Sequence, residues 1–182
     1  MLMIDICCGL KGASQMMTAR GWNVVTLDID PRFSPAIVAD VRDWHWAGSP
    51  VDLLWMSPPC DEFAREWMPW SKTGRAPDMS IVDACRRLVD EIQPRYWVLE
   101  NVRGAVPYLG TPRAIVGPFY FWGNFPAIGK PSMAGFRKKE SYSSTQAAER
   151  AAIPRGISLA FALACERQSV LIDAYADREL TL

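Results

Sequence analysis

Short apolar runs that stop at a glycine, an acid or a proline are the feature that most constrains how these 182 residues can fold. We expect five of them to be strands: Leu2–Cys7, Trp22–Leu27, Ala36–Ala39, Val51–Met56 and Tyr96–Leu99. The run at 51–56 is apolar almost throughout, which is typical of a central parallel strand buried on both faces. The pattern therefore predicts a sheet with polar groups gathered at its strand ends.

Helical patterns alternate with these runs. We expect helices over Ala13–Arg20 and Asp78–Gln93, and a mostly helical segment from Gln146 to about Asp177. A loop is expected over Asp61–Pro77, and short strands or loops around Phe119–Trp122. With no repeats and no low-complexity linkers, residues 1–182 read as one α/β domain, Rossmann-like, with a mostly parallel sheet.

Membrane and secreted proteins are disfavoured by the apolar patterning. Hydrophobic residues are 49% and charged residues 22%, as in ordinary globular domains. The longest apolar run near the C-terminus, Ile157–Cys165, is far below the roughly 18 residues of a membrane span. The N-terminus has no basic segment before its apolar run, so a signal peptide is not predicted. We expect a cytoplasmic protein.

Few chemistries are open to this composition. His45 is the single histidine, and the five cysteines form no C-x-x-C pair, so reduced thiols and no metal site are expected. Basic and acidic residues balance at 20 each, which does not favour strong nonspecific binding to an anionic polymer, although a local patch is still open. Catalysis would then depend on cysteine, carboxylates or a bound cofactor.

Polar groups follow the predicted strands at Gly9–Gly12, Asp28, Asp40, Ser57–Cys60 and Glu100-Asn101. The carboxyl ends of parallel strands meet at one edge, so these groups should line one crevice. A glycine turn allows a ligand to approach the backbone, and an acid about 20 residues later commonly binds ribose hydroxyls. The alternatives are a tight connection for the turn and a turn or cap role for each aspartate.

Cys60 is the strongest candidate nucleophile. Two prolines before it stiffen the chain and withhold two N–H donors, and a thiolate is a good nucleophile. Cys85 and Cys165 fit ordinary core positions instead. Glu100 ends an apolar strand, where burial would raise its pKa and suit it to act as an acid; the alternative is a surface acid.

In chain order, these segments resemble motifs of the cytosine-C5 DNA methyltransferases, over roughly residues 1–110. The matching segments are Asp5–Ser14 (DICCGLKGAS), Asp28–Asp30, Asp40-Val41, Ser57–Cys60 with Phe63 after it, and Glu100–Val102 (ENV). Several such motifs in the correct order are not expected by chance. The later segments resemble small phage- or plasmid-borne relatives.

The resemblance implies S-adenosylmethionine as methyl donor, DNA as substrate, and catalysis by Cys60 and Glu100. It implies these cofactor-binding residues: Asp5, Cys8, Gly9, Leu10, Gly12, Asp28, Ile29, Asp40, Val41 and Pro58. Asp28 would hold the ribose and Asp40 the adenine. The candidate substrate-binding residues are Asn101, Arg103, Trp67, Trp70 and Arg137. The two tryptophans could stack on a base, although ordinary packing of their loop explains them equally well.

The chain departs from the family pattern in several places. Lys11 replaces the second glycine of the opening motif, and Ile29 replaces an aromatic residue. The arginine motif Q-x-R-x-R has no clear match, which makes Arg103 and Arg137 its possible substitutes.

The region for target recognition also departs from the family pattern. Residues 110–144 form only a short insertion where the family places a large target-recognition region, so we expect relaxed or short recognition, unless a protein partner or second subunit completes it. The basic stretch 129–155 could contact phosphates. Two other functions stay open: a catalytically weak accessory that binds S-adenosylmethionine or DNA, and a methyltransferase of a free cytosine nucleotide.

Overall fold

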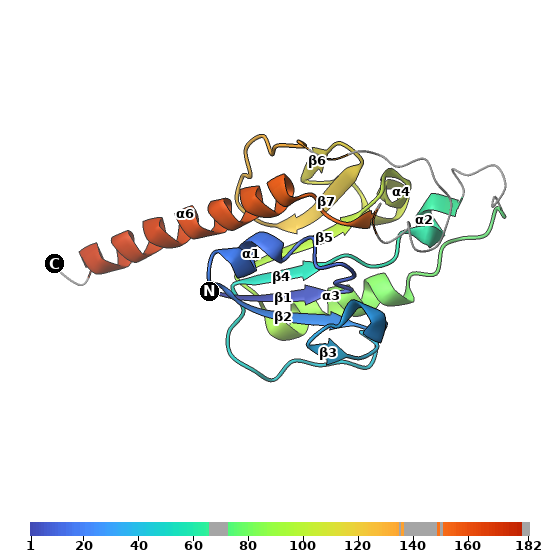
Figure 1. Ribbon diagram of the computed structural model, residues 1–182, viewed down its shortest axis with the longest axis horizontal. Coiled ribbons are helices and arrows are strands. Elements are labelled where there is room, and N and C mark those ends of the chain that lie inside the picture. Colours follow the sequence, from blue (N-terminus) through green and yellow to red (C-terminus); the bar gives the residue numbers. More distant parts are fainter. Residues whose placement is uncertain (66–72, 135, 137–148, 150, 180–182) are drawn as a thin grey trace.

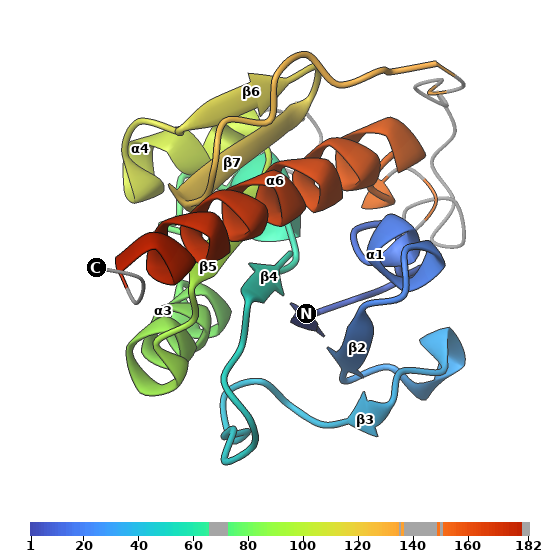
Figure 2. The same cartoon turned by 90° about the vertical axis from the view of Figure 1, so that its left-hand side faces the viewer.

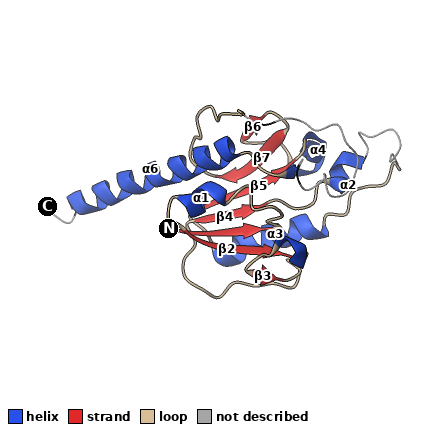
Figure 3. Cartoon of the chain, in the orientation of Figure 1, coloured by secondary structure: helices blue, strands red, loops and turns tan. Residues whose placement is uncertain are grey.

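The computed structural model describes residues 1–65, 73–134, 136, 149 and 151–179, and the side chains as far as residue 168. All described strands belong to one seven-stranded sheet, in the order β3-β2-β1-β4-β5-β7-β6 (Figures 1 and 3). The strands are β1 (Leu2–Ile6), β2 (Asn23–Asp28), β3 (Ile37–Val38), β4 (Leu53–Met56), β5 (Tyr96–Asn101), β6 (Ala114–Val116) and β7 (Phe119–Asn124).

The sheet is mostly parallel. β1, β2, β3, β4 and β5 run in one direction, and β7 pairs antiparallel with β5 and with β6. The chain crosses from β3 to β4 on the far side of β1, so the strand order reverses between β1 and β4. The predicted Rossmann-like α/β domain with a mostly parallel sheet is confirmed.

Helices cover both faces of the sheet (Figure 2). One face carries α1 (Gln15–Ala19) and α6 (Arg155–Glu179), with Met17 and Phe161 packed against Trp55 and Phe121. The other face carries α3 (Ser80–Ile92), whose Leu88 joins a core with Ile4, Leu54 and Leu99. Successive β1 residues alternate between the two cores, as the twofold period of a strand requires.

Two predicted boundaries were wrong. The predicted loop after Cys60 begins with the short helix α2 (Asp61–Ala64), because the Cys60 carbonyl accepts the amides of Phe63 and Ala64 at 3.1 and 2.8 Å. β5 extends through Asn101 because β7 pairs with it there. The predicted 110–144 insertion includes β6 and β7, where short strands or loops are expected from the sequence, and part of it lies outside the described residues.

Two further helical segments follow β5: the 3-10 helix η3 (Arg103–Ala105) and α4 (Val106–Leu109). A 3-10 turn, η1 (Pro31–Phe33), follows β2. No helix in the described ranges is long and apolar enough to cross a membrane.

Candidate active site

The predicted strand-end groups lie along one edge of the sheet, at the carboxyl ends of β1, β2, β4 and β5 (Figure 1). The Cys8 amide donates to the Leu27 carbonyl at 3.1 Å, and the Ser57 amide donates to the Ile6 carbonyl at 3.1 Å. These bonds extend the strand ladders by one residue and fix the turns that follow. The convergence predicted from the sequence is therefore present in the structure.

The turn after β1 is built from left-handed backbone conformations. Cys7, Gly9 and Lys11 have φ angles of 55°, 47° and 59°. A methyl group added at Gly9 would meet no atom within 4 Å, so the space above the turn is open to a ligand. The left-handed backbone conformation of Lys11 is strained, whereas glycine would adopt it without a steric penalty. Its Nζ donates to the Ser34 carbonyl at 2.6 Å and ties this turn to the chain after β2.

Gly12 is required by close packing. A Cβ there would lie 2.6 Å from the amide nitrogen and 2.7 Å from the carbonyl oxygen of Ile153, which precedes α6. Gln15 Nε2 donates to the same Ile153 carbonyl at 3.1 Å. The glycine turn is therefore held against the segment leading into the last helix.

We expect Gly12→Ala to lower the free energy of unfolding by about 2 kcal/mol, because the Ile153 backbone cannot move away cheaply. Gly21→Ala is the control: its φ is 82°, but no atom lies within 4 Å of the added methyl group. That variant should lose only the strain of a left-handed alanine, about 1 kcal/mol. Urea unfolding measures both, and an equal loss in the two variants would contradict the packing explanation.

Asp28 links the glycine turn to the end of β2. Its Oδ2 accepts the Gly9 amide at 2.8 Å and its Oδ1 accepts the Asp30 amide at 2.9 Å. The carboxylate is 8% exposed and keeps lone pairs for hydroxyl donors. Beside it, the Ile29 side chain is 62% exposed, and Leu10 on the glycine turn is 50% exposed. An acid with uncovered apolar side chains beside it suits a ligand that carries hydroxyls and an aromatic ring.

Two predicted cofactor contacts lie beneath the turn. Asp5 is 1% exposed and its Oδ2 accepts the Ser14 hydroxyl at 2.6 Å. Burial raises its pKa to about 7. The Cys8 thiol is buried as well, and burial raises its pKa to about 12. Both side chains therefore support the turn from inside, and their predicted contact with a cofactor stays a prediction.

The segment Asp40-Val41 follows β3. The Arg42 guanidinium pairs with the Asp40 carboxylate and lowers its pKa to about 2, so this side chain stays ionised. Val41 points inward, 4% exposed, into the core beneath α3. Its backbone is therefore the part that remains available to a ligand.

Two hydrogen bonds join the end of β5 to the segment after β4. The Ser57 side chain bonds the Glu100 carboxyl group, and Trp55 Nε1 donates to Ser57 Oγ at 2.9 Å. Asn101 Nδ2 donates to the Pro58 carbonyl at 3.0 Å. The half-buried Cys60 follows two residues later, so Glu100 and Cys60 are fixed to one scaffold.

Glu100 has the environment of an acid catalyst. It is 9% exposed, and burial raises its pKa to about 8, against the smaller opposite effect of the Ser57 hydrogen bond. The side chain is therefore mainly protonated at neutral pH and able to donate a hydrogen bond. The alternative of a solvated surface acid is excluded by this burial.

The predicted substrate-binding residues divide into three cases. Asn101 is 1% exposed; its Nδ2 donates to the Pro58 carbonyl and its Oδ1 accepts the Val102 amide, so its side chain holds the segment that leads to Cys60. Arg103 is exposed on η3, which packs against α2. Trp67, Trp70 and Arg137 lie outside the described residues.

Sequence reasoning missed Tyr108, an aromatic side chain beside the Cys60 helix. It lies on α4, is 45% exposed, and its ring centre is 5.9 Å from that of the buried Phe63. Its only sequence signal is its position a few residues after the E-N-V motif.

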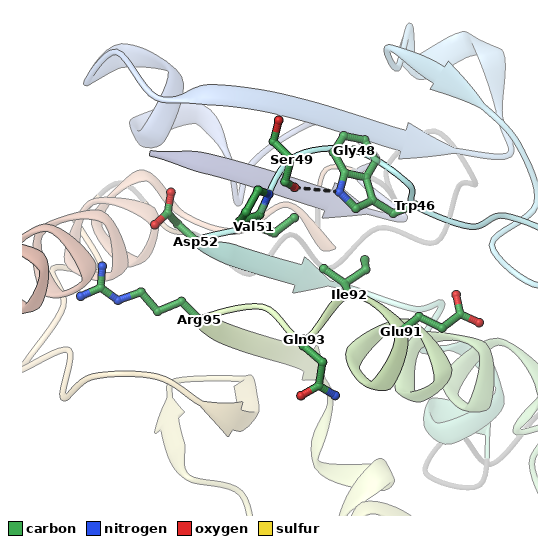
Figure 4. A pocket seen from close by; sticks show the side chains of 10 residues that line it. Trp46, Gly48, Ser49, Val51, Asp52, Glu91, Ile92, Gln93 and Arg95 are labelled. Atoms are coloured by element: carbon green, nitrogen blue, oxygen red, sulfur yellow. Dashed lines mark hydrogen bonds between the residues drawn. The ribbon is translucent and has the colours of Figure 1, made fainter.

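A cavity of about 620 Å³ lies at the opposite, amino-terminal edge of the sheet. Figure 4 shows its lining by the segment before β4 and by the chain between α3 and β5, including Trp46, Asp52, Glu91 and Arg95. It contains none of the predicted site residues. No group of three or more His, Cys, Asp or Glu side chains in the described part of the chain could hold a metal ion.

Comparisons with known proteins give partial likenesses only. No protein-family model matches the chain, and no curated protein matches it. A candidate DNA modification methyltransferase encoded within an Escherichia coli prophage is 23% identical, with a TM-score of 0.44, over 58% of this chain and 33% of that one. The PH0226 protein from Pyrococcus horikoshii OT3 is 16% identical, with a TM-score of 0.40, over 63% of this chain and 56% of that one. This chain therefore spans about a third of the first protein and about half of the second, and neither likeness carries a function over to it.

Proposed function

We propose that this protein is an S-adenosylmethionine-dependent methyltransferase that modifies C5 of cytosine in DNA. The observation that carries the proposal is the buried Glu100, with its raised pKa, on the same hydrogen-bonded scaffold as Cys60. A buried carboxylic acid whose strand end is bonded to the segment of a cysteine that follows two prolines is suited to covalent chemistry on a base that must be protonated or hydrogen-bonded.

The residues at the ends of β1 and β2 fit the cofactor. Open space lies above the Gly9 turn, the Asp28 carboxylate can accept ribose hydroxyls, and the exposed Ile29 side chain can cover an adenine ring. S-adenosylmethionine would supply an electrophilic methyl group there. The backbone at Asp40-Val41, on the neighbouring strand end, would meet the adenine edge.

Covalent addition gives cytosine C5 the nucleophilicity that it lacks in the free base. The Cys60 thiolate adds to C6 of the ring while Glu100 donates a hydrogen bond to N3, which stabilises the electron density moved onto the ring. C5 would then behave as an enamine carbon and attack the methyl group of S-adenosylmethionine; the broken S–C bond would leave its electron pair on sulfur, and S-adenosylhomocysteine would depart as a neutral thioether. Loss of the C5 proton to solvent or a nearby base breaks the Cys60–C6 bond and restores the thiolate.

The substrate must expose its base to this site. A cytosine inside a duplex is out of reach, so the target is flipped out of the helix or is already single-stranded. Arg103 and Tyr108 are exposed close to α2 and would contact the nucleic acid. We expect short or relaxed sequence recognition for the chain by itself, with stricter recognition supplied by a partner or a second subunit.

The test is methyl transfer from labelled S-adenosylmethionine to double-stranded DNA, single-stranded DNA and dCMP, with 5-methylcytosine quantified after digestion. 5-Methylcytosine in either form of DNA supports the proposal. Methylation of dCMP alone would show that the substrate is a free nucleotide and not DNA. Cofactor binding by calorimetry without turnover on any substrate favours an accessory protein. A strict six-base-pair recognition site for the isolated chain would contradict the relaxed recognition.

A further inference from the structure

Arg87 on α3 holds the chain that follows β3. Its Nη2 donates to the carbonyls of Val41 at 3.0 Å, Trp44 at 2.8 Å and Arg42 at 3.4 Å. This chain, residues 39–46, has no helix or strand, so its carbonyls have no ladder partners. One guanidinium therefore satisfies three backbone acceptors from a segment more than 40 residues away.

The guanidinium is itself fixed in place. Its Nη1 donates to Glu91 Oε1 at 2.7 Å, one helical turn along α3, and lies 3.0 Å from His45 Nδ1. Glu91 Oε2 lies 3.1 Å from the same His45 nitrogen. A closed triangle of contacts thus links Arg87, Glu91 and His45. It joins α3 to the loop through the His45 side chain, in addition to the backbone carbonyls that Arg87 bonds.

The loop held in this way begins with Asp40 and Val41. Val41 is packed into the α3 core at 4% exposure, whereas the Asp40 side chain is 23% exposed and pairs with Arg42. Arg87 contacts the loop from the side of α3, so it reaches neither the glycine turn nor the Cys60 segment by any described hydrogen bond.

We propose that Arg87 is a positioning residue for adenine: it fixes the backbone of the Asp40-Val41 segment against which the adenine of the cofactor would lie. The inference rests on the proposed function, since it assigns the adenine end of the cofactor to this loop. Lysine cannot replace Arg87 here, because a single ammonium cannot serve three carbonyls and Glu91 in a fixed planar geometry.

We expect Arg87→Lys to weaken S-adenosylmethionine binding about tenfold, since a small displacement of a positioning loop has effects of this size. 5′-Methylthioadenosine, which keeps the adenine and ribose and lacks the amino acid, should lose affinity by the same factor. At saturating cofactor, kcat should stay within about twofold of the wild type, because the Cys60 scaffold is untouched. A purely structural role would lower the melting temperature without this split between affinity and kcat.

Two variants complete the experiment, measured by calorimetry at a temperature where circular dichroism shows each protein folded. Arg86→Lys, the control, changes the neighbouring side chain, which pairs with Asp83 at 3.2 Å, and should bind like the wild type. Glu91→Gln removes the charge of the acid in the same triangle and weakens it less than Arg87→Lys does. Its affinity for S-adenosylmethionine should fall about threefold. Equal binding by wild type and Arg87→Lys, or an equal loss in Arg86→Lys, would overturn the inference alone. Absence of binding by the wild type would overturn the proposed function and the inference together.

Discussion

Cys60→Ser is expected to reduce methyl transfer at least 10³-fold and to abolish covalent attachment to DNA that contains 5-fluorocytosine. The hydroxyl is a far weaker nucleophile than a thiolate, so C6 would not be attacked at a useful rate. The substitution removes one half-buried sulfur atom at the start of α2 and leaves the backbone bonds of Cys60 to Phe63 and Ala64 in place. The fold should therefore be kept, and so should binding of the cofactor.

Fluorine at C5 traps the covalent adduct, so that it can be detected. It cannot leave as a proton, so the adduct cannot eliminate and the protein stays bonded to C6 through sulfur. A denaturing gel then shows a slower band, and mass spectrometry of the digested protein locates the bonded residue at position 60.

Cys85→Ala is the matched control, because Cys85 is fully buried in the core beneath α3. That variant should lose stability of about 1 kcal/mol, as removal of a small buried group does, and keep adduct formation. Adduct formation by Cys60→Ser, or its loss in a folded Cys85→Ala, would rule out Cys60 as the nucleophile.

The gathering of polar groups at one edge of the sheet could be predicted from the sequence, because each of these strands ends at a recognisable residue. Apolar runs stop at Gly9, Asp28, Ser57 and Glu100, and the parallel arrangement then places those positions at one edge. These signals are local, which is why they can be read without tertiary information.

Supports that depend on distant contacts could not be read in the same way. Asn101 bonds Pro58, 43 residues away, and Arg87 bonds Trp44, 43 residues away. Neither residue has a local pattern that distinguishes it from a substrate contact or a surface arginine. The expectation that Asn101 meets substrate came from its motif position alone, and the fold uses its amide internally.

Weak periodicity explains the errors in the boundaries. β7 is rich in aromatic residues without an alternating polar face, since both faces of Phe119–Asn124 meet core side chains. α2 has only four residues, which is too short for a helical pattern to appear. The burial of Glu100 follows from β7, because Phe121 lies opposite it in the sheet, and so the degree of its pKa shift could not be read from β5 by itself.

Glu100→Gln is expected to reduce methyl transfer by about 10²–10⁴-fold. At high pH the variant should also gain stability relative to the wild type. The amide has nearly the same shape, can still bond Ser57 and can donate an N–H hydrogen bond to N3, but it has no acidic proton to transfer to N3 as electron density builds up on the ring. Binding of the cofactor should be unchanged. The catalytic loss and the stability gain would thus come from the same buried group.

The sign of the stability effect follows from the pKa. Burial raises the pKa of Glu100 to about 8, whereas an unfolded glutamate titrates near ~4.3. Between these values the unfolded chain has released its proton and the folded protein has kept it, so wild-type stability falls as pH rises from about 4.3 to about 8. The stability that Glu100 contributes is present in full below that window and is lost above it, an effect of a few kcal/mol.

Glutamine does not titrate, so the variant lacks this decline, and the stability difference between variant and wild type should grow from pH 5 to pH 9. Asp5, whose pKa is raised to about 7, contributes a decline of the same sign to both proteins, so it cancels in the difference. Urea unfolding at the two pH values measures the change, with Asp90→Asn, which removes an exposed carboxylate on α3, as the control. A parallel pH profile for wild type and Glu100→Gln would mean that Glu100 is ionised in the folded protein, and it could then not serve as the hydrogen-bond donor to N3.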